Sequence, residues 1–395
     1  MTSEVADSTV ENVIGTYSLP LGLALNFRVN EVDRIVPLAV EEPSVIAAAS
    51  NAARLVRRSG GFTAQMLSNL MTGQIELRGV KNAERSIEAL TQSKSTLVEA
   101  GNAAVPNLVQ RGGGVRELEV RDLGRETLVL HFQIDCRDAM GANLVNTVAE
   151  ALGAKVASIA HARLGLRILT NLCDQRRVLA RCRIALADLE STDAETQANS
   201  SAGLATALAI EEASNFAAID PYRAATHNKG IMNGIDSVVI ATGNDFRAVE
   251  AGAHAWAARA GRYGSLAEWH VEGEYLTGSL ELPLALGIVG GTIRVHRVAQ
   301  WALRLLGVNS ASELSEIVAC VGLASNFSAL RALATEGIQR GHMSLQARSV
   351  ALAAGARPDE VDIVAARLAD TGPTNEMTAR TLLDRLRAAK AERLP

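Results

Sequence analysis

Two charged residues in the middle of the chain could together stabilise a negative charge and move a proton. Lys229 sits between an asparagine and a glycine in the stretch Thr226–Gly230, which predicts a polar loop. A lysine there could be an ordinary solvated loop residue, or a cation that faces a developing oxyanion. Asp245 follows it by sixteen residues, at a predicted strand-to-helix turn. That aspartate could cap the helix or meet Lys229 at one end of a sheet.

Glu42 and His342 are further candidates for proton transfer. Glu42 stands directly before Pro43 and Ser44, at the expected start of a helix. Its carboxylate could complement the helix dipole, or it could be a general acid held beside a lysine. His342 lies between a glycine and a methionine. A lone histidine is more often structural, but near neutral pH it could also protonate a leaving group.

The run Asp138–Asn143 is a candidate for binding a phosphate group. It follows a predicted strand and opens a predicted helix, and its small residues would let backbone N–H groups approach a phosphate or pyrophosphate. No GxGxxG motif stands at a strand-to-helix junction, so this is not a Rossmann fingerprint.

Hydrophobic periodicity predicts the elements that must position these residues. Alternation predicts strands over Gln74–Leu77, Val115–Val120, Thr127–Ile134, Leu164–Leu169 and Val178–Leu186. Helices are expected over Ser44–Arg58, 81–101, Asp138–Leu152, Asn199–Ala218, Phe246–Gly261 and 313–336. The β-branched run Ser237–Ala241 predicts a short buried strand directly after the loop that carries Lys229.

Length and composition indicate a soluble globular protein of two or three domains. The chain has 395 residues, of which 48% are hydrophobic and 21% charged. Its formal charge of −4, with no basic block, argues against a nucleic-acid binder. The four cysteines have neither CxxC spacing nor a histidine at ligand spacing, so no metal site is predicted and reduced thiols are expected. No signal peptide and no apolar run long enough to span a membrane are evident, which predicts a cytoplasmic protein.

Taken in order, the motifs resemble those of class II 3-hydroxy-3-methylglutaryl-coenzyme A reductase, the soluble bacterial form. The similarity covers nearly everything from residue 11 onward. The matching stretches are ENVIG (Glu11–Gly15), VEEPS (Val40–Ser44), GGG (Gly112–Gly114), DAMGAN (Asp138–Asn143), DPYRAATHNKGIMNGID (Asp220–Asp236), ATGNDFRAVEAGAHA (Ala241–Ala255) and RALATEGIQRGHM (Arg331–Met343).

The resemblance implies a fold and a domain division. It implies a large substrate-binding α/β domain around a central helix, made of residues 1–68 and 173–337. A small α/β domain over 69–172, not of the Rossmann type, would be inserted into it and bind the nicotinamide cofactor. A mobile helical flap would follow over 338–395.

The resemblance also implies roles for individual residues. The catalytic set would be Glu42, Lys229, Asp245 and His342, with Asp245 bridging the first two and His342 protonating the departing coenzyme A thiolate. The substrate-binding set would be Ser44, Asn171, Arg223, Thr226 and Asn233. The cofactor-binding set would be Asp138, Met140, Gly141 and Asn143. Two hydride transfers would interconvert hydroxymethylglutaryl-CoA and mevalonate plus coenzyme A.

Three departures from the family pattern bear on the cofactor and on assembly. Val105 stands where NAD-preferring members carry an acid that holds the adenosine ribose, and the nearby Arg111 could attract a 2′-phosphate. The catalytic stretches look most like the NAD-using branch, so NAD is expected, with NADP possible.

Only ten residues precede ENVIG, fewer than usual, which affects part of the coenzyme A contact and the dimer surface. Gln346 replaces a second histidine, with little expected consequence. A homodimer or higher homo-oligomer is still expected, with the active site at the subunit interface.

Two other functions fit less well. One is an oxidoreductase on a related acyl-CoA, against which the complete set of Ser44, Asn171 and Arg223 argues. The other is a non-catalytic homologue that binds coenzyme A, against which all four catalytic matches argue.

Overall fold

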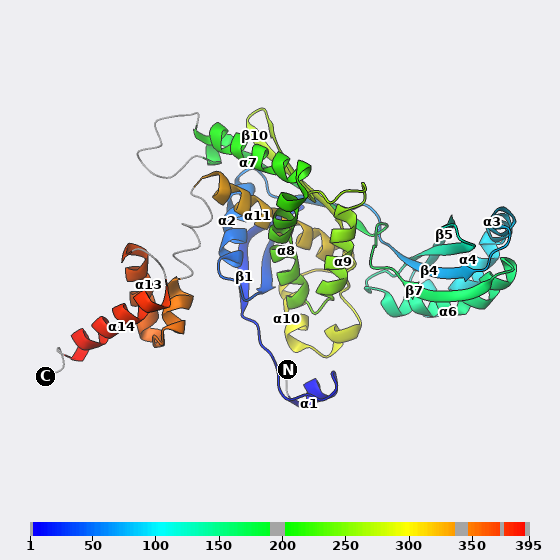
Figure 1. Ribbon diagram of the computed structural model, residues 1–395, viewed down its shortest axis with the longest axis horizontal. Helices are drawn as coiled ribbons and strands as arrows, with labels where there is room; N and C mark the ends of the chain where they lie inside the picture. Colours follow the sequence, from blue (N-terminus) through cyan, green and yellow to red (C-terminus); the bar gives the residue numbers. More distant parts are fainter. Residues whose placement is uncertain (1–2, 190–201, 336–346, 372–374, 392–395) are drawn as a thin grey trace.

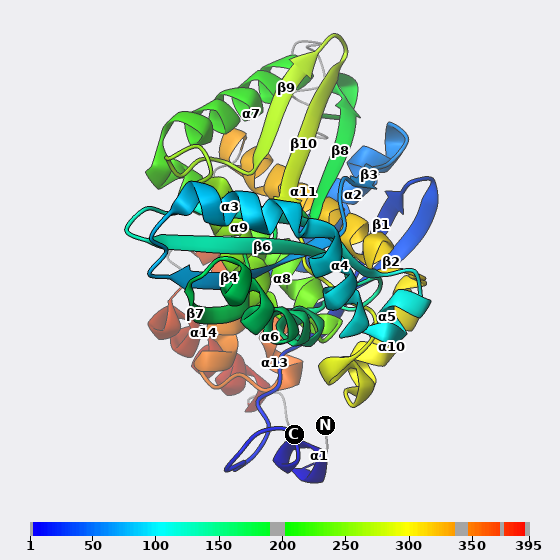
Figure 2. The same cartoon turned by 90° about the vertical axis from the view of Figure 1, so that its right-hand side faces the viewer.

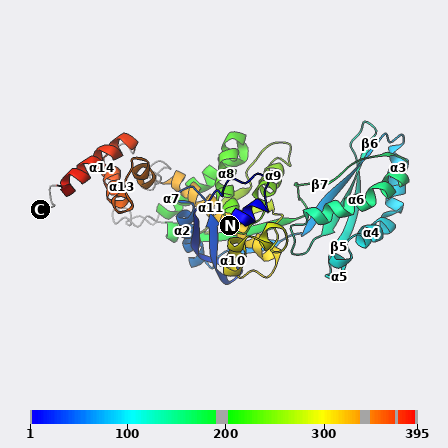
Figure 3. The same cartoon turned by 90° about the horizontal axis from the view of Figure 1, so that it is seen from below.

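The computed structural model describes residues 3–189, 202–335, 347–371 and 375–391. Three groups of elements, each with its own buried core, follow one another in space (Figures 1 and 3). The mixed α/β fold expected from the sequence is confirmed.

The first group is a four-stranded antiparallel sheet with helices packed on it. Its strand order is β5-β6-β4-β7, with β4 at Leu70–Arg78, β5 at Gly114–Asp122, β6 at Thr127–Asp135 and β7 at Arg163–Leu169. Helices α3 (Ala83–Gln92), α4 (Lys94–Ala103), α5 (Pro106–Gln110) and α6 (Ala142–Ile159) complete it, and Figure 2 views the molecule from its side. The four strands predicted from alternation in this region are confirmed. Apolar residues of β4, β5 and β6 are buried with the helices in one core, whereas Leu166 and Ile168 of β7 are exposed.

The helix expected from Asp138 begins later than predicted. Gly141 is its N-cap, at a left-handed φ of 106°, and the helix starts at Ala142. An added Cβ at Gly141 would lie 2.5 Å from the sulfur of Cys136, so glycine is required there both by φ and by space.

The second group surrounds the long helix α11 (Ala311–Ala334). A four-stranded antiparallel sheet has the order β3-β8-β10-β9, with β3 at Thr63–Met66, β8 at Arg177–Ala185, β9 at Ala267–Glu272 and β10 at Tyr275–Pro283. The hairpin β1–β2 (Leu21–Val29 and Val32–Ala39) lies beside it, after the short helix α1 (Ser3–Asp7). The helices are α2 (Val45–Arg58), α7 (Ala202–Ile219), α8 (Pro221–Ala241), α9 (Phe246–Ala257) and α10 (Arg297–Leu306).

Helix α11 is the centre of this group. It packs against α2, α7 and α8 and against strands β3, β8 and β10. Among the described residues it is the one helix long and apolar enough to cross a membrane, but 67% of its most apolar window is buried inside the protein. Its hydrophobicity is therefore that of a core helix.

Helix α8 corrects two predictions, because neither a loop at Lys229 nor a strand at Ser237–Ala241 exists. Both stretches belong to one helix of 21 residues. The Asp220 carboxylate caps it by accepting the Arg223 N–H at 3.1 Å, and Pro221 occupies the first turn. Gly234 allows close helix packing rather than turning the chain, because a Cβ there would lie 2.8 Å from the carbonyl oxygen of Val321 on α11.

The third group is C-terminal. Residues 347–353 are helical and share a small core with α13 (Pro358–Thr371) and α14 (Glu376–Ala391). Within it, the buried carboxylate of Glu360 accepts hydrogen bonds from Arg387 at 2.8 and 3.1 Å and from the Arg357 N–H at 2.8 Å. The side-chain bonds from Arg387 and the Arg357 N–H lower the pKa of Glu360 to about 2.

Candidate active site

The lysine and the glutamate singled out from the sequence meet in the structure. Lys229 is near the middle of α8, and its Nζ lies 2.8 Å from Oε2 of Glu42, in the turn before α2. The Lys229 side chain is 60% exposed and that of Glu42 is 35% exposed. A solvent-accessible ammonium next to a carboxylate is thus available to a ligand, because surrounding side chains do not enclose it.

The face of α8 that carries Lys229 also carries three of the expected substrate-binding residues. With 3.6 residues per turn, Thr226 lies just under one turn before Lys229 and Asn233 about one turn after it. Arg223 lies one turn before Thr226 and is half-buried. Partial desolvation lowers the pKa of Arg223.

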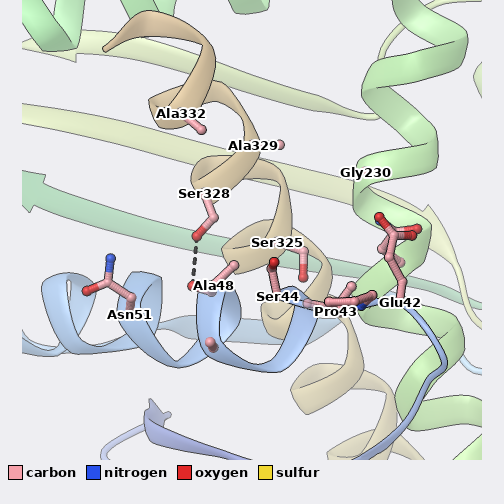
Figure 4. Close-up of a pocket in the computed structure, with 13 residues that line it drawn as sticks. Glu42, Pro43, Ser44, Ala48, Asn51, Gly230, Ser325, Ser328, Ala329 and Ala332 are labelled. Carbon is pink, nitrogen blue, oxygen red and sulfur yellow. Dashed lines mark hydrogen bonds between the residues drawn. The ribbon is translucent and has the colours of Figure 1, made fainter. Parts of the chain in front are cut away.

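A pocket of about 430 Å³ opens beside this face, between α2, α8 and α11. Its lining includes Glu42, Ser44 and Asn233, and it is otherwise mostly apolar (Figure 4). Ser44 is the N-cap of α2 at a left-handed φ of 78°, an uncommon conformation for a non-glycine residue. Its buried hydroxyl has no hydrogen-bond partner among the described residues, and neither does that of Ser325 on α11. Unpaired buried hydroxyls in a pocket suit a polar ligand.

Asp245 lies in a different place. It caps α9, accepting the N–H groups of Arg247 at 3.1 Å and Ala248 at 3.2 Å. Lys229 is separated from the end of α8 at Ala241 by about 18 Å of continuous helix, which is more than a lysine side chain spans. Spacing of sixteen residues therefore does not bring the two side chains together within one chain.

Asp245 instead lines a second pocket of about 400 Å³ with three of the expected cofactor-binding residues, Met140, Gly141 and Asn143. The remainder of its lining comes from the first turn of α6, the turn at Gly243–Arg247, and the loop 287–293. Helix α6 begins there without a side-chain cap, so its first N–H groups are available to an anion. Gly290 and Gly291, in the same lining, leave open space where a Cβ would stand. Arg247 adds a positive charge, its side chain 80% exposed.

Among the described residues, Asp138, Asn171, Val105 and Arg111 line neither pocket. The Asp138 carboxylate accepts the N–H of Ala311 at 3.0 Å, at the start of α11. Asn171 follows β7 and is exposed, and its carbonyl oxygen packs against Gly252 of α9. His342 lies outside the described residues. Val105 is buried in the core of the small sheet, whereas Arg111 is exposed.

Sequence reasoning missed Arg176 and Asn244, which join the loops around the second pocket. Asn244 stands in the TGND motif beside Asp245, which was the available signal. No pattern marked Arg176, because a single arginine before a strand is unremarkable until its burial is known.

Comparison with known proteins matches residues 1–347 to the family model described as hydroxymethylglutaryl-coenzyme A reductase. The chain is 46% identical over 389 residues to the 3-hydroxy-3-methylglutaryl-coenzyme A reductase of Archaeoglobus fulgidus, covering 98% of this chain and 86% of that one. It is 36% identical over 348 residues to a probable reductase of Borreliella burgdorferi, covering 86% and 77%.

Solved structures of two reductase chains resemble this protein over nearly its whole length. The reductase of Streptococcus pneumoniae superposes with a TM-score of 0.83 at 44% identity, covering 98% of this chain and 91% of that one. A structure of the class II enzyme from the same organism, bound to NADPH in open conformations, gives a TM-score of 0.81 at 44% identity, covering 98% and 93%.

The fold and its relatives define an oxidoreductase of mixed α/β architecture. The chain belongs to the hydroxymethylglutaryl-coenzyme A reductase family, and within that family to class II.

Proposed function

We propose that Lys229 and Glu42 form the reacting centre at which hydroxymethylglutaryl-CoA is reduced to mevalonate and coenzyme A. The reaction is that of the family. The observation that carries this assignment is the 2.8 Å contact between the two side chains at the edge of a pocket with unpaired hydroxyls. The rival functions, reduction of another acyl-CoA and binding without catalysis, have no such observation in their favour.

The pair can provide both the charge and the proton that the reaction needs. The Lys229 ammonium would stabilise the oxyanion that forms on the thioester carbonyl, an effect of about 3–4 kcal/mol for a well-placed donor. Glu42 would give its proton to the aldehyde oxygen in the second reduction. Ser44, Arg223, Thr226 and Asn233 would hold the hydroxymethylglutaryl group, and their hydroxyl, guanidinium and amide groups suit its carboxylate and hydroxyl. His342, outside the described residues, stays a predicted proton donor to the thiolate.

The second pocket is the proposed nicotinamide site. When bound, the reduced cofactor supplies the two hydrides. The uncapped start of α6 and Arg247 fit its pyrophosphate, and Met140 and Asn143 line the space beside it. Asp138 would act indirectly, because its carboxylate is engaged by Ala311. We expect NAD to be used, with weak discrimination against NADP, since Val105 is buried and cannot contact a ribose. The pneumococcal relative was solved with NADPH.

We infer that the two pockets act together across a pair of subunits. Lys229 and Asp245 cannot reach each other within one chain, yet the family resemblance places both at one reacting carbon. A twofold dimer solves this, because the Lys229 side of one subunit can face the Asp245 side of its partner. The exposed Asn171, beside α9, would then contact substrate held by the partner's α8.

Each of the three groups of elements would have one task. The group around α11 (1–68 and 173–337) would bind the substrate, the small sheet (69–172) would bind the cofactor, and the C-terminal helices (338–395) would close over the site. The enzyme is expected to act in the cytoplasm.

A turnover assay tests this function directly. Hydroxymethylglutaryl-CoA should be consumed with two equivalents of reduced cofactor, and Lys229→Ala should lower kcat by at least about a hundredfold. Faster turnover of other acyl thioesters, or binding of coenzyme A without turnover, would favour the rival functions.

A further inference from the structure

Arg176 is a fully buried arginine whose hydrogen bonds go to backbone. One Nη donates to the carbonyl oxygens of Met140 at 2.8 Å and Ala139 at 3.2 Å, and the other donates to Leu286 at 2.7 Å. Its exposed fraction is 0%, and burial lowers its pKa. Placing a guanidinium there costs desolvation energy, so its role is to hold the segment 139–140 against the segment after β10.

Asn244 holds Gly287, the residue after Leu286. Its Oδ1 accepts the Gly287 N–H at 2.8 Å, and its Nδ2 donates to the Gly287 carbonyl oxygen at 3.1 Å. The side-chain amide thereby makes both bonds that a neighbouring strand would make. Since Asp245 is the next residue in the chain, the position of the Asp245 backbone is tied to Gly287.

The segment 286–289, which bonds to both Arg176 and Asn244, is itself packed closely against the backbone of residues 138–140. The Ile288 N–H donates to the Asp138 carbonyl oxygen at 2.9 Å, and Val289 forms a bridge with Ala139. A Cβ at Gly287 would lie 2.5 Å from the backbone nitrogen of Met140. Backbone groups packed this closely transmit a shift on one side to the other.

We propose that Arg176 and Asn244 are positioning residues that fix the cofactor-binding turn at Ala139–Gly141 relative to Asp245, acting through the segment 286–289. This rests on the assignment of the second pocket to the nicotinamide cofactor. Arg176 lines neither pocket, and Asn244 lines the second one. The polar atoms of both side chains bond to backbone groups, which is how they hold the turn. Loss of either clamp therefore impairs use of the cofactor and leaves the hydroxymethylglutaryl pocket, built by α2, α8 and α11, intact.

The experiment compares Arg176→Met and Asn244→Ala with two matched controls in the full-length enzyme. Asn30→Ala removes the same kind of clamp at a distant place, where Asn30 accepts from the Ala64 N–H at 2.8 Å and donates to its carbonyl oxygen at 2.9 Å. Arg177→Met removes the adjacent arginine, which pairs with Glu281 rather than with the turn. Each variant is characterised by Tm, by kcat, by the KM for each substrate, and by the Kd of reduced cofactor from fluorescence titration.

For Arg176→Met and Asn244→Ala, the Kd and KM of the cofactor should rise by roughly tenfold or more and kcat should fall, as expected for a displaced binding turn. The KM for hydroxymethylglutaryl-CoA should stay within about twofold. The controls should lower Tm without changing the ratio of the two KM values. If Arg176→Met does not fold, Arg176→Lys replaces it, because an ammonium lacks the fork that reaches three carbonyls. The double variant should lose less cofactor affinity than the product of the single losses, since both clamps act on one segment.

Lower Tm with an unchanged cofactor Kd, or equal rises in both KM values, would overturn the positioning role. Asn143→Ala distinguishes failure of the positioning role from failure of the assignment of the second pocket to the cofactor, because Asn143 lines that pocket directly. A raised cofactor Kd in Asn143→Ala alone refutes only the positioning role. No change in any of the three variants refutes the pocket assignment itself.

Discussion

Complementation between two inactive variants tests whether the catalytic groups come from two subunits. Lys229→Ala and Asp245→Asn should each be nearly inactive, the first by at least about a hundredfold. Both should fold, because alanine suits the interior of α8 and asparagine can still cap α9. Within one chain, about 18 Å of helix lies between Lys229 and the end of α8 at Ala241, and Asp245 lies beyond that end. In a mixed dimer, one site would therefore carry both substitutions and the other would carry neither.

The expected recovery follows from this geometry. Random assembly of equal amounts gives half mixed dimers, and each has one intact site of two, so turnover should return to about one quarter of wild type. A mixed dimer purified through two different tags should reach about one half. The assay is cofactor oxidation with saturating substrate, after co-expression of the two variants.

Lys229→Ala mixed with Glu42→Gln is the matched control. These residues touch within one chain at 2.8 Å, so each site of that mixed dimer keeps one substitution and no activity should return. Recovery in this control, or none with Asp245→Asn, would contradict a site shared in the proposed way. Full activity of a wild-type monomer in sedimentation would contradict the dimer altogether.

Four further predictions follow from individual residues. His342→Ala should cripple thioester reduction but spare reduction of free mevaldehyde, which releases no thiol; equal losses would rule out that role. The ratio of kcat/KM for the two cofactors should favour NAD only weakly, and a preference for NADP beyond about tenfold would reverse this expectation; in that case Arg111→Ala should remove most of the advantage. Gly141→Ala should weaken cofactor binding, because its φ of 106° and the Cys136 sulfur leave no place for a Cβ; an unchanged cofactor Kd would count against the second pocket. Glu360 has a lowered pKa, so its contribution to stability is present above its ordinary pKa near 4.5 and disappears as the pH falls towards about 2. In Glu360→Gln, hydrogen exchange over 347–371 should lose this dependence on pH. The same pH profile in the variant as in the wild type would refute the prediction.

Strands β4 and β6 of the small sheet were predictable because each has a buried face, which imposes alternation on the sequence. Helix α8 was not. Its stretch Thr226–Gly230 was interpreted as a loop, but those residues lie inside the helix. Gly234, further along, is where α8 approaches the α11 backbone. Its run Ser237–Ala241 was interpreted as a strand, yet those residues are buried around the end of a helix, and tertiary packing overrides their intrinsic preference.

The candidate site shows a similar division. Glu42 lies in contact with Lys229, as a carboxylate held beside a lysine should, and its role as a general acid stays a prediction. The expected contact of Lys229 with Asp245 depended on a sheet edge that does not exist. The residues after Lys229 instead continue α8 to Ala241, which carries the chain away from Lys229 before it reaches Asp245. Arg176 could not be found from sequence, because its importance depends on three carbonyl groups far away in the chain.

The central position of α11 also constrains the order in which the protein can fold during synthesis. Its partners α2, α8 and β3 all emerge from the ribosome earlier, and their apolar faces cannot be covered until residue 334 has been made. The small sheet has its own core, whose buried residues lie between Met71 and Cys173 apart from Ala285, so most of it can close as soon as that stretch is complete. A nascent chain ending near residue 300 should therefore carry one folded unit within an otherwise unprotected, chaperone-dependent polypeptide.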